Sequence, residues 1–88
     1  MSVEIPSNWI EKENSLVRIF IFKDFSSCVL FVQEIAKLAE SIQHHPDISI
    51  FSYKHVKVVL STHDEGNTIT DQDVTMANQI NDIFTLRF

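Results

Sequence analysis

The histidines are the residues of this chain best suited to chemistry near neutral pH. The chain has four of them: His44 and His45 are adjacent and precede Pro46, while His55 and His63 stand alone further along. An imidazole can donate or accept a proton at this pH, so two or three of them around one hollow supply both an acid and a base. Such reactions need neither a cofactor nor a nucleophile. The pattern therefore predicts a proton-transfer activity such as dehydration, hydration or tautomerisation.

Carboxylates accompany the histidines along the chain. Glu40 precedes His44 by four residues. On a helix that continues this far, the two side chains share a face and the carboxylate can orient the imidazole. Asp47, Asp64 and Glu65 add negative charge nearby. We expect a group of imidazoles with an acidic rim, in which Asp64 and Glu65 contact a substrate mainly through their backbone.

The same residue types could instead bind a metal. Three histidines and a carboxylate satisfy the tetrahedral coordination of zinc. Adjacent histidines rarely point at one ion, however, and the sequence lacks the regularly spaced ligand motifs of zinc sites. We therefore expect neither a metal nor another cofactor. Taken alone, His44 and His45 could equally be a polar helix C-terminus, where cationic side chains interact favourably with the helix dipole.

The histidine pair follows a predicted long helix over residues 24–43. Apolar residues recur there at helical spacing, at positions 25, 28, 29, 32, 35, 36, 39 and 42. Asp24 is a suitable N-cap. Pro46 prevents the helix from continuing and favours an extended conformation at His45. Cys28, on the apolar stripe, is expected to be a small buried side chain.

Two alternating runs, residues 48–53 and 56–62, predict a hairpin with its turn at residues 54–55. This register places Pro46 opposite His63, and facing residues of an antiparallel pair have Cα atoms ~4.5–5.5 Å apart. Histidines that are distant in sequence would therefore meet at the open end of the hairpin. His55 lies in the predicted turn, and we expect its side chain to be exposed.

The other elements complete an α+β domain. Residues 9–13 and a run ending at Phe22 predict two strands joined by a turn at residues 14–15. A last helix opens with a capping-box pattern from Thr70 to Asp73, and Asp73 is interpreted as a cap. The order strand, strand, helix, strand, strand, helix predicts a four-stranded antiparallel sheet with helices packed on one face.

Length and composition limit the class of protein. The 88 residues predict a single domain over residues 1–88, with 44% hydrophobic and 22% charged residues. A net charge of −5 disfavours nucleic acid as a partner. One cysteine excludes an intrachain disulfide, and the N-terminal residues do not resemble a signal peptide. We expect a cytoplasmic protein with no membrane segment, and the single glycine leaves no glycine-rich phosphate loop.

The small size of the domain also favours self-association. A chain of this length buries only about 60–65% of its unfolded surface, so its core is thin. The seven phenylalanines and the two edges of the sheet provide surface that another copy could cover. We expect a homodimer or homotetramer.

The residues around the histidines resemble those of the pterin-4a-carbinolamine dehydratase family. The resemblance covers nearly the whole chain and centres on the HHP motif at residues 44–46 and the Thr-His pair at residues 62–63. Further matching residues are Trp9, Phe20 to Phe25, Ala39, Glu40, Asp47, Tyr53, Val56, Val58, Leu60, Ser61, Asp64, Thr70, Asp73 and Ala77.

The resemblance implies a specific reaction and a set of site residues. The family dehydrates 4a-hydroxytetrahydropterin to quinonoid dihydropterin, which is recycled to tetrahydrobiopterin after aromatic amino-acid hydroxylation. Its matching histidines, His44, His45 and His63, bind the pterin and act as acid and base. The residues expected to bind substrate are Glu40, Pro46, Thr62, Asp64 and Glu65. Animal members also act as dimerisation cofactors of a homeodomain transcription factor.

A second class of function remains open at this point. A non-catalytic, oligomeric binding or regulatory module could have the same fold, although the intact set of one glutamate and three histidines favours an enzyme. The chain departs from the family at Gln43, where animal members carry an acidic residue, and at Ile48, where an aromatic residue is common. Members commonly have a further helix before Trp9.

Overall fold

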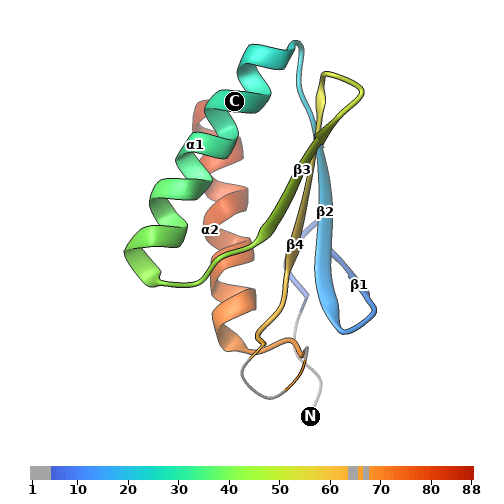
Figure 1. Cartoon of the computed structure of the whole chain (residues 1–88), viewed down its shortest axis with the longest axis vertical. Coiled ribbons are helices and arrows are strands. Elements are labelled where there is room, and N and C mark those ends of the chain that lie inside the picture. The colour runs from blue at the N-terminus through green and yellow to red at the C-terminus, as the bar shows by residue number, and fades with distance from the viewer. Residues whose placement is uncertain (1–4, 64–65, 67) are drawn as a thin grey trace.

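The computed structural model describes residues 5–63, 66 and 68–88. It contains four strands and two helices in the predicted order, which confirms the α+β fold (Figure 1). Their bounds are β1 Ile10–Lys12, β2 Ser15–Ile21, α1 Phe25–Ile42, β3 Asp47–Phe51, β4 His55–Leu60 and α2 Asp71–Arg87. Among the described residues, neither helix combines the length and the apolar character that crossing a membrane requires.

The sheet is antiparallel throughout, with the strand order β1-β2-β4-β3. Strands β2 and β4 therefore occupy the centre, as the apolar residues on both faces of β2 predict. Both helices cover the same face of the sheet (Figure 1). The loop after α1, the end of β4 and the start of α2 lie together at the lower end of the molecule in this view.

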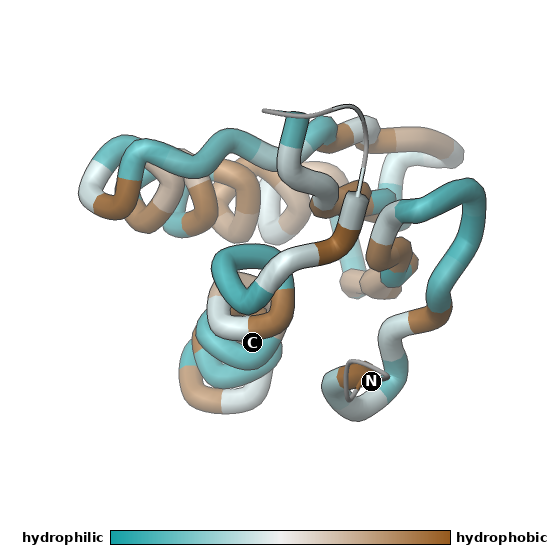
Figure 2. Tube along the Cα trace, turned by 90° about the horizontal axis from the view of Figure 1, so that it is seen from below, coloured by the Kyte–Doolittle hydropathy of each residue, from teal (hydrophilic) through white to brown (hydrophobic). Residues whose placement is uncertain are grey.

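The core lies between the sheet and the helices. Both helices alternate hydrophilic and hydrophobic segments along their turns, as expected for helices with one buried face (Figure 2). The buried cluster contains Trp9, Leu16, Phe20, Phe22, Cys28, Phe31, Ile35, Ala39, Val56, Val58, Leu60, Met76, Ala77 and Ile80. Trp9 belongs to it and donates from Nε1 to Asn81 Oδ1 at 2.8 Å. Burial raises the pKa of the Cys28 thiol, in keeping with its predicted role as a small buried side chain.

Helix α1 begins as predicted and buries a somewhat different face. Asp24 is the N-cap: its carboxylate accepts from the backbone N–H of Ser27 at 2.8 Å, and hydrogen bonding by Ser27 lowers the pKa of Asp24. The buried positions are Cys28, Phe31, Ile35 and Ala39. The predicted stripe was wrong in omitting Phe31 and in including four exposed residues: Phe25, Val29, Ala36 and Ile42.

Both predicted turns are displaced. The β1–β2 turn lies at Glu13 and Asn14, both with positive φ, and Ser15 is already paired in β2. The β3–β4 turn covers residues 52–54, because Phe51 pairs with His55. Ser52 and Tyr53 adopt the left-handed conformation, with φ of 48° and 53°.

The displaced hairpin turn changes the register. Asp47 pairs with Val59, so continuing the ladder places Pro46 level with Leu60. The predicted pairing of Pro46 with His63 was therefore wrong. The expectation of an exposed His55 was also wrong, because its half-buried ring stacks on Phe51 with centroids 4.9 Å apart.

Candidate active site

The side chains of His44 and His45, which follow the end of α1, point in different directions. Helix α1 stops at Ile42, and Gln43 caps it in the left-handed conformation with φ of 53°. The backbone N–H groups of Gln43 and His44 both donate to the carbonyl oxygen of Ala39. The chain then turns toward β3, so His44 and His45 no longer follow the helical repeat. Each histidine contacts a different carboxylate: His44 contacts Asp73, and His45 contacts Glu40.

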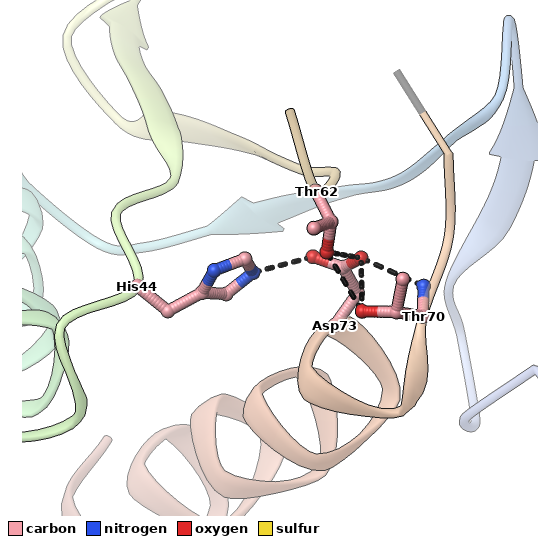
Figure 3. Close-up of polar contacts among 4 residues, drawn as sticks. All are labelled: His44, Thr62, Thr70 and Asp73. Atoms are coloured by element: carbon pink, nitrogen blue, oxygen red, sulfur yellow. Dashed lines mark hydrogen bonds and ion pairs between the residues drawn. The ribbon is translucent and has the colours of Figure 1, made fainter. Parts of the chain in front are cut away.

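His44 points at Asp73, in the first turn of α2 (Figure 3). The distance from His44 Nε2 to Asp73 Oδ1 is 2.6 Å, and the two side chains are 10% and 0% exposed. A carboxylate that accepts from one ring nitrogen fixes the orientation of the imidazole. The other ring nitrogen, Nδ1, is then the atom at which His44 can exchange a proton with a substrate.

Asp73 is itself held by two threonines (Figure 3). Its Oδ2 accepts from the hydroxyl of Thr62 at 2.8 Å and from the backbone N–H of Thr70 at 2.9 Å. The hydroxyls of Thr62 and Thr70 lie 2.7 Å apart. Both carboxylate oxygens are therefore satisfied although the side chain is fully buried, as a buried charge requires. We refer to His44, Thr62, Thr70 and Asp73 as the Asp73 network.

His45 forms the second pair, with Glu40 in the last turn of α1. Its Nε2 lies 2.5 Å from Glu40 Oε2, and the side chains are 57% and 72% exposed. The expectation that Glu40 orients His44 was wrong, because the helix ends before His44 and the left-handed Gln43 redirects the chain. Solvent screens an exposed pair of this kind, so it contributes little to stability.

The three predicted catalytic histidines border one hollow of about 260 Å³. Its lining residues come from the end of α1, the end of β4 and the start of α2: Gln43, His44, His45, Ser61, Thr62, His63 and Gln72. The volume is close to the lower end of small-molecule sites, ~300–1,000 Å³. A polar hollow with several imidazoles is suited to acid–base chemistry on a small polar ring system.

A larger hollow of about 370 Å³ lies away from the histidines. It is formed by the end of β2, the start of α1 and the end of α2, and lined by Ile21, Phe22, Lys23, Ser27, Leu30, Phe84, Arg87 and Phe88. Its ionisable lining side chains are Lys23 and Arg87, and Arg87 is paired with Glu34. It lacks groups that exchange protons near neutral pH. The histidine hollow is therefore the better candidate for acid–base chemistry.

The predicted substrate-binding residues fall into three groups. The hydroxyl of Thr62 lies in the Asp73 network. Glu40 does not line the hollow itself but contacts His45, which does. Pro46 is half-buried and is not among the described residues that line the hollow. Asp64 and Glu65 lie outside the described residues.

Asp73 and Ser61 are among the site residues that the sequence interpretation missed, together with Gln43 and Gln72, which also line the hollow. Asp73 was interpreted as a helix cap only; its carboxylate does cap α2 through the backbone of Thr70, and it also contacts His44. Ser61 lines the hollow beside Thr62. The only sequence signal for either residue was its place in the pattern of residues that resembles the dehydratases.

Comparisons with known proteins identify one family for this chain. The family model for pterin 4 alpha carbinolamine dehydratase matches residues 2–83. Curated relatives that carry this family's name include a Thermomicrobium roseum protein, 42% identical over 77 residues, which are 88% of this chain and 80% of the relative. A Nostoc punctiforme relative is 41% identical over 80 residues, which are 91% and 84% of the two chains.

Solved structures share the fold. A transcriptional coactivator/pterin dehydratase from Brucella melitensis superposes with a TM-score of 0.80 at 37% identity, covering 88% of this chain and 82% of that one. A pterin dehydratase-like protein identified as a RuBisCO assembly factor of the alpha-carboxysome has a TM-score of 0.71 at 22% identity, covering 86% and 88%. The second likeness concerns the fold alone.

Proposed function

Because this chain belongs to the pterin 4 alpha carbinolamine dehydratase family, we propose that it removes water from 4a-hydroxytetrahydropterin to give quinonoid dihydropterin. The observation that carries the proposal is one hollow bordered by His44, His45 and His63, in which a buried carboxylate holds His44. In this role the chain serves the recycling of tetrahydrobiopterin after an aromatic amino-acid hydroxylase has acted.

The reaction requires two proton transfers in opposite directions. The C4a–O bond breaks as an imidazolium protonates the departing hydroxyl, which leaves as water. The lone pair on N5 forms the C4a=N5 double bond, and the N5 proton passes to a neutral imidazole or to water. One proton is delivered and one is removed, so the reaction needs neither oxidant nor reductant.

His44 is our candidate for the acid. Its Nε2 is hydrogen-bonded to Asp73. The Asp73 carboxylate balances the positive charge that His44 carries when protonated. Nδ1 then delivers the proton. His45 and His63, on the same hollow, are the candidates for the group that receives the N5 proton. Thr62 and Thr70 act indirectly, because they hold the carboxylate that holds His44.

The direct test is a stopped assay of quinonoid dihydropterin formation from freshly generated 4a-carbinolamine. The intermediate also dehydrates spontaneously, so we expect wild-type protein at micromolar concentration to exceed a measurable background. His55→Ala is the matched control, because His55 begins β4 at the end of the hairpin opposite the hollow and we expect it to keep the wild-type rate. The spontaneous rate in the presence of wild-type protein would favour the non-catalytic binding module.

We propose that the activity is independent of metal, because imidazoles alone supply the acid and the base. Protein treated with EDTA and verified as metal-free by elemental analysis is expected to retain its full rate. Loss of activity that zinc restores would instead indicate a metal-dependent hydratase built from the same histidines.

We further propose that the protein self-associates. Large apolar side chains are exposed on the sheet face away from the helices and on α1, including Ile19, Ile21, Phe51, Phe25 and Leu30. In the part of the chain that the structure describes, strands β1 and β3 form the two open edges of the sheet. We expect light scattering to give the mass of a dimer or tetramer. A monomer at every accessible concentration would contradict this proposal.

A further inference from the structure

The larger hollow, of about 370 Å³, lies at the opposite end of the molecule from the histidines. It is formed where β2 ends, α1 begins and α2 ends, at the upper end of the view in Figure 1. Helix α1, which is 18 residues long, runs from this hollow to the histidine hollow. A helix of that length spans about 27 Å, so a small ligand in one hollow does not reach the other.

Exposed apolar side chains gather around the larger hollow. Ile21, Leu30 and Phe88 line it and are 61%, 54% and 43% exposed. The rings of Phe84 and Phe88, also in the lining, both meet the ring of Phe22 nearly edge to face, with centroids 5.4 and 5.5 Å away. Apolar side chains that cluster around a concavity mark a binding site, and a further aromatic ring extends edge-to-face packing of this kind. The lining therefore suits a ligand that carries an aromatic group.

The charged groups of this hollow are cationic, although the chain as a whole has a net charge of −5. Lys23 and Arg87 line it. Arg87 and Lys37 lie 3.0 Å from different oxygens of Glu34, so a single negative charge is shared by two positive ones. In the part of the chain that the structure describes, Lys23 forms no ion pair, and the carboxylate of the neighbouring Asp24 serves as the N-cap of α1. An anion in the hollow therefore meets an excess of positive charge.

We propose that this hollow is a second ligand site, which binds a small aryl carboxylate: an aromatic ring joined by a short linker to a carboxylate. The ring packs against the phenylalanines of the lining, and the carboxylate accepts hydrogen bonds from Lys23 and Arg87. A guanidinium has five N–H donors, and the Arg87 side chain is 63% exposed, so Arg87 can bind the ligand and keep its existing ion pair. This inference goes beyond the proposed dehydration and does not depend on it.

The test uses three probes that separate the ring from the charge. Phenylacetate has both, phenylacetamide has nearly the same shape without the charge, and acetate has the charge without the ring. Each is titrated at neutral pH into the full chain labelled with ¹⁵N, and binding is measured from the assigned backbone amide shifts. We expect phenylacetate to shift the amides of Lys23, Ser27 and Arg87 saturably, with a Kd on the order of 0.1–10 mM. The other two probes should bind at least about fivefold more weakly.

Two pairs of variants test the contacts. Lys23→Gln removes a charge from the lining, and Lys57→Gln is its control because Lys57 is exposed on β4, outside the lining. Leu30→Ser removes an apolar part of the wall, and Leu86→Ser is its control because Leu86 is exposed on α2, also outside the lining. We expect the Kd for phenylacetate to rise about two- to fivefold in Lys23→Gln and about three- to tenfold in Leu30→Ser. Both controls should match wild type.

Three results would overturn the proposal. Phenylacetamide that binds as tightly as phenylacetate would contradict the anionic class of the ligand, and acetate that binds as tightly would contradict the role of the ring. Phenylacetate shifts that are confined to the histidine hollow, at Gln43 and Gln72 for example, or that are absent because a second copy covers the site, would contradict the location. Dehydration measured on the same four variants should match wild type, and wild-type protein that does not accelerate dehydration would leave the binding result unaffected.

Discussion

Two histidines that line the hollow each contact a carboxylate, and the separations are nearly equal: 2.6 Å for His44–Asp73 and 2.5 Å for His45–Glu40. The first pair is buried and joins residues 29 positions apart in the chain, whereas the second is exposed and joins residues five apart. Two threonines fix the carboxylate of the first pair. Among the described residues, the Glu40 carboxylate of the second pair has no hydrogen-bond donor besides His45, and this pair lies in solvent at the end of α1.

The comparison shows that distance alone does not decide what a pair contributes. A buried carboxylate with both oxygens hydrogen-bonded holds its imidazole in one orientation, whereas an exposed pair is screened by water and salt. We therefore attribute positioning to the Asp73 network and only a modest electrostatic effect to the Glu40–His45 pair. Three substitutions test this division of roles.

Replacement of His44 should have the largest effect. His44→Ala removes the proposed acid and leaves Asp73 without its partner at Oδ1. Loss of one general acid–base group typically costs ~10²–10⁴-fold in rate, and we expect a value near the lower end because the substrate also dehydrates spontaneously. The measurement is kcat/KM after subtraction of the background, with circular dichroism to verify folding. A folded His44→Ala protein with the wild-type rate would remove His44 from the mechanism.

Asp73→Asn should have an intermediate effect on rate and a clear effect on stability. An amide keeps the shape of the carboxylate and loses one acceptor oxygen, so one donor among His44, Thr62 and Thr70 is left without a partner. We expect a rate loss of roughly 10–100-fold and a decrease of about 1–3 kcal/mol in the free energy of unfolding. Urea denaturation and the dehydration assay measure the two quantities.

The positioning role of Asp73 is tested by combining the two variants. If Asp73 acts through His44, adding Asp73→Asn to His44→Ala should lower the rate little further. A full multiplicative loss in the double variant would mean that Asp73 acts on the substrate independently of His44.

Glu40→Gln should have the smallest effect. The exposed pair with His45 is screened, so we expect the rate to fall by no more than about fivefold and the unfolding free energy to change by less than about 1 kcal/mol. Because salt screens an exposed charge, the difference between the variant and wild type should shrink as ionic strength rises. A loss equal to that of Asp73→Asn would refute the proposed difference between the pairs.

Most of the fold could be predicted from local sequence patterns. Helical spacing and the Asp24 cap located α1, and the capping-box pattern at Thr70 located the start of α2. The hairpin turn could not be located in this way. Ser52 and Tyr53 adopt positive φ without a glycine or asparagine to signal it, so the turn was placed too late and the register was displaced.

The site was predictable in its histidines and not in their partners. His44, His45 and His63 do line one hollow, which follows from the elements that end there. The partner of Glu40 depends on a single left-handed residue, Gln43, that ends α1 before His44. The second role of Asp73 depends on how closely α2 approaches the end of α1, a tertiary contact that local patterns do not encode.

The most direct test of the account is the rate of dehydration measured side by side for wild type, His44→Ala and His45→Ala at one pH, after subtraction of the spontaneous rate. The account predicts that wild-type protein accelerates the reaction and that His44→Ala loses much more of this acceleration than His45→Ala, because only His44 is held by the buried network. Wild-type protein that adds nothing to the spontaneous rate would contradict the proposed activity. A loss in His45→Ala equal to or larger than that in His44→Ala would contradict the assignment of the acid to His44.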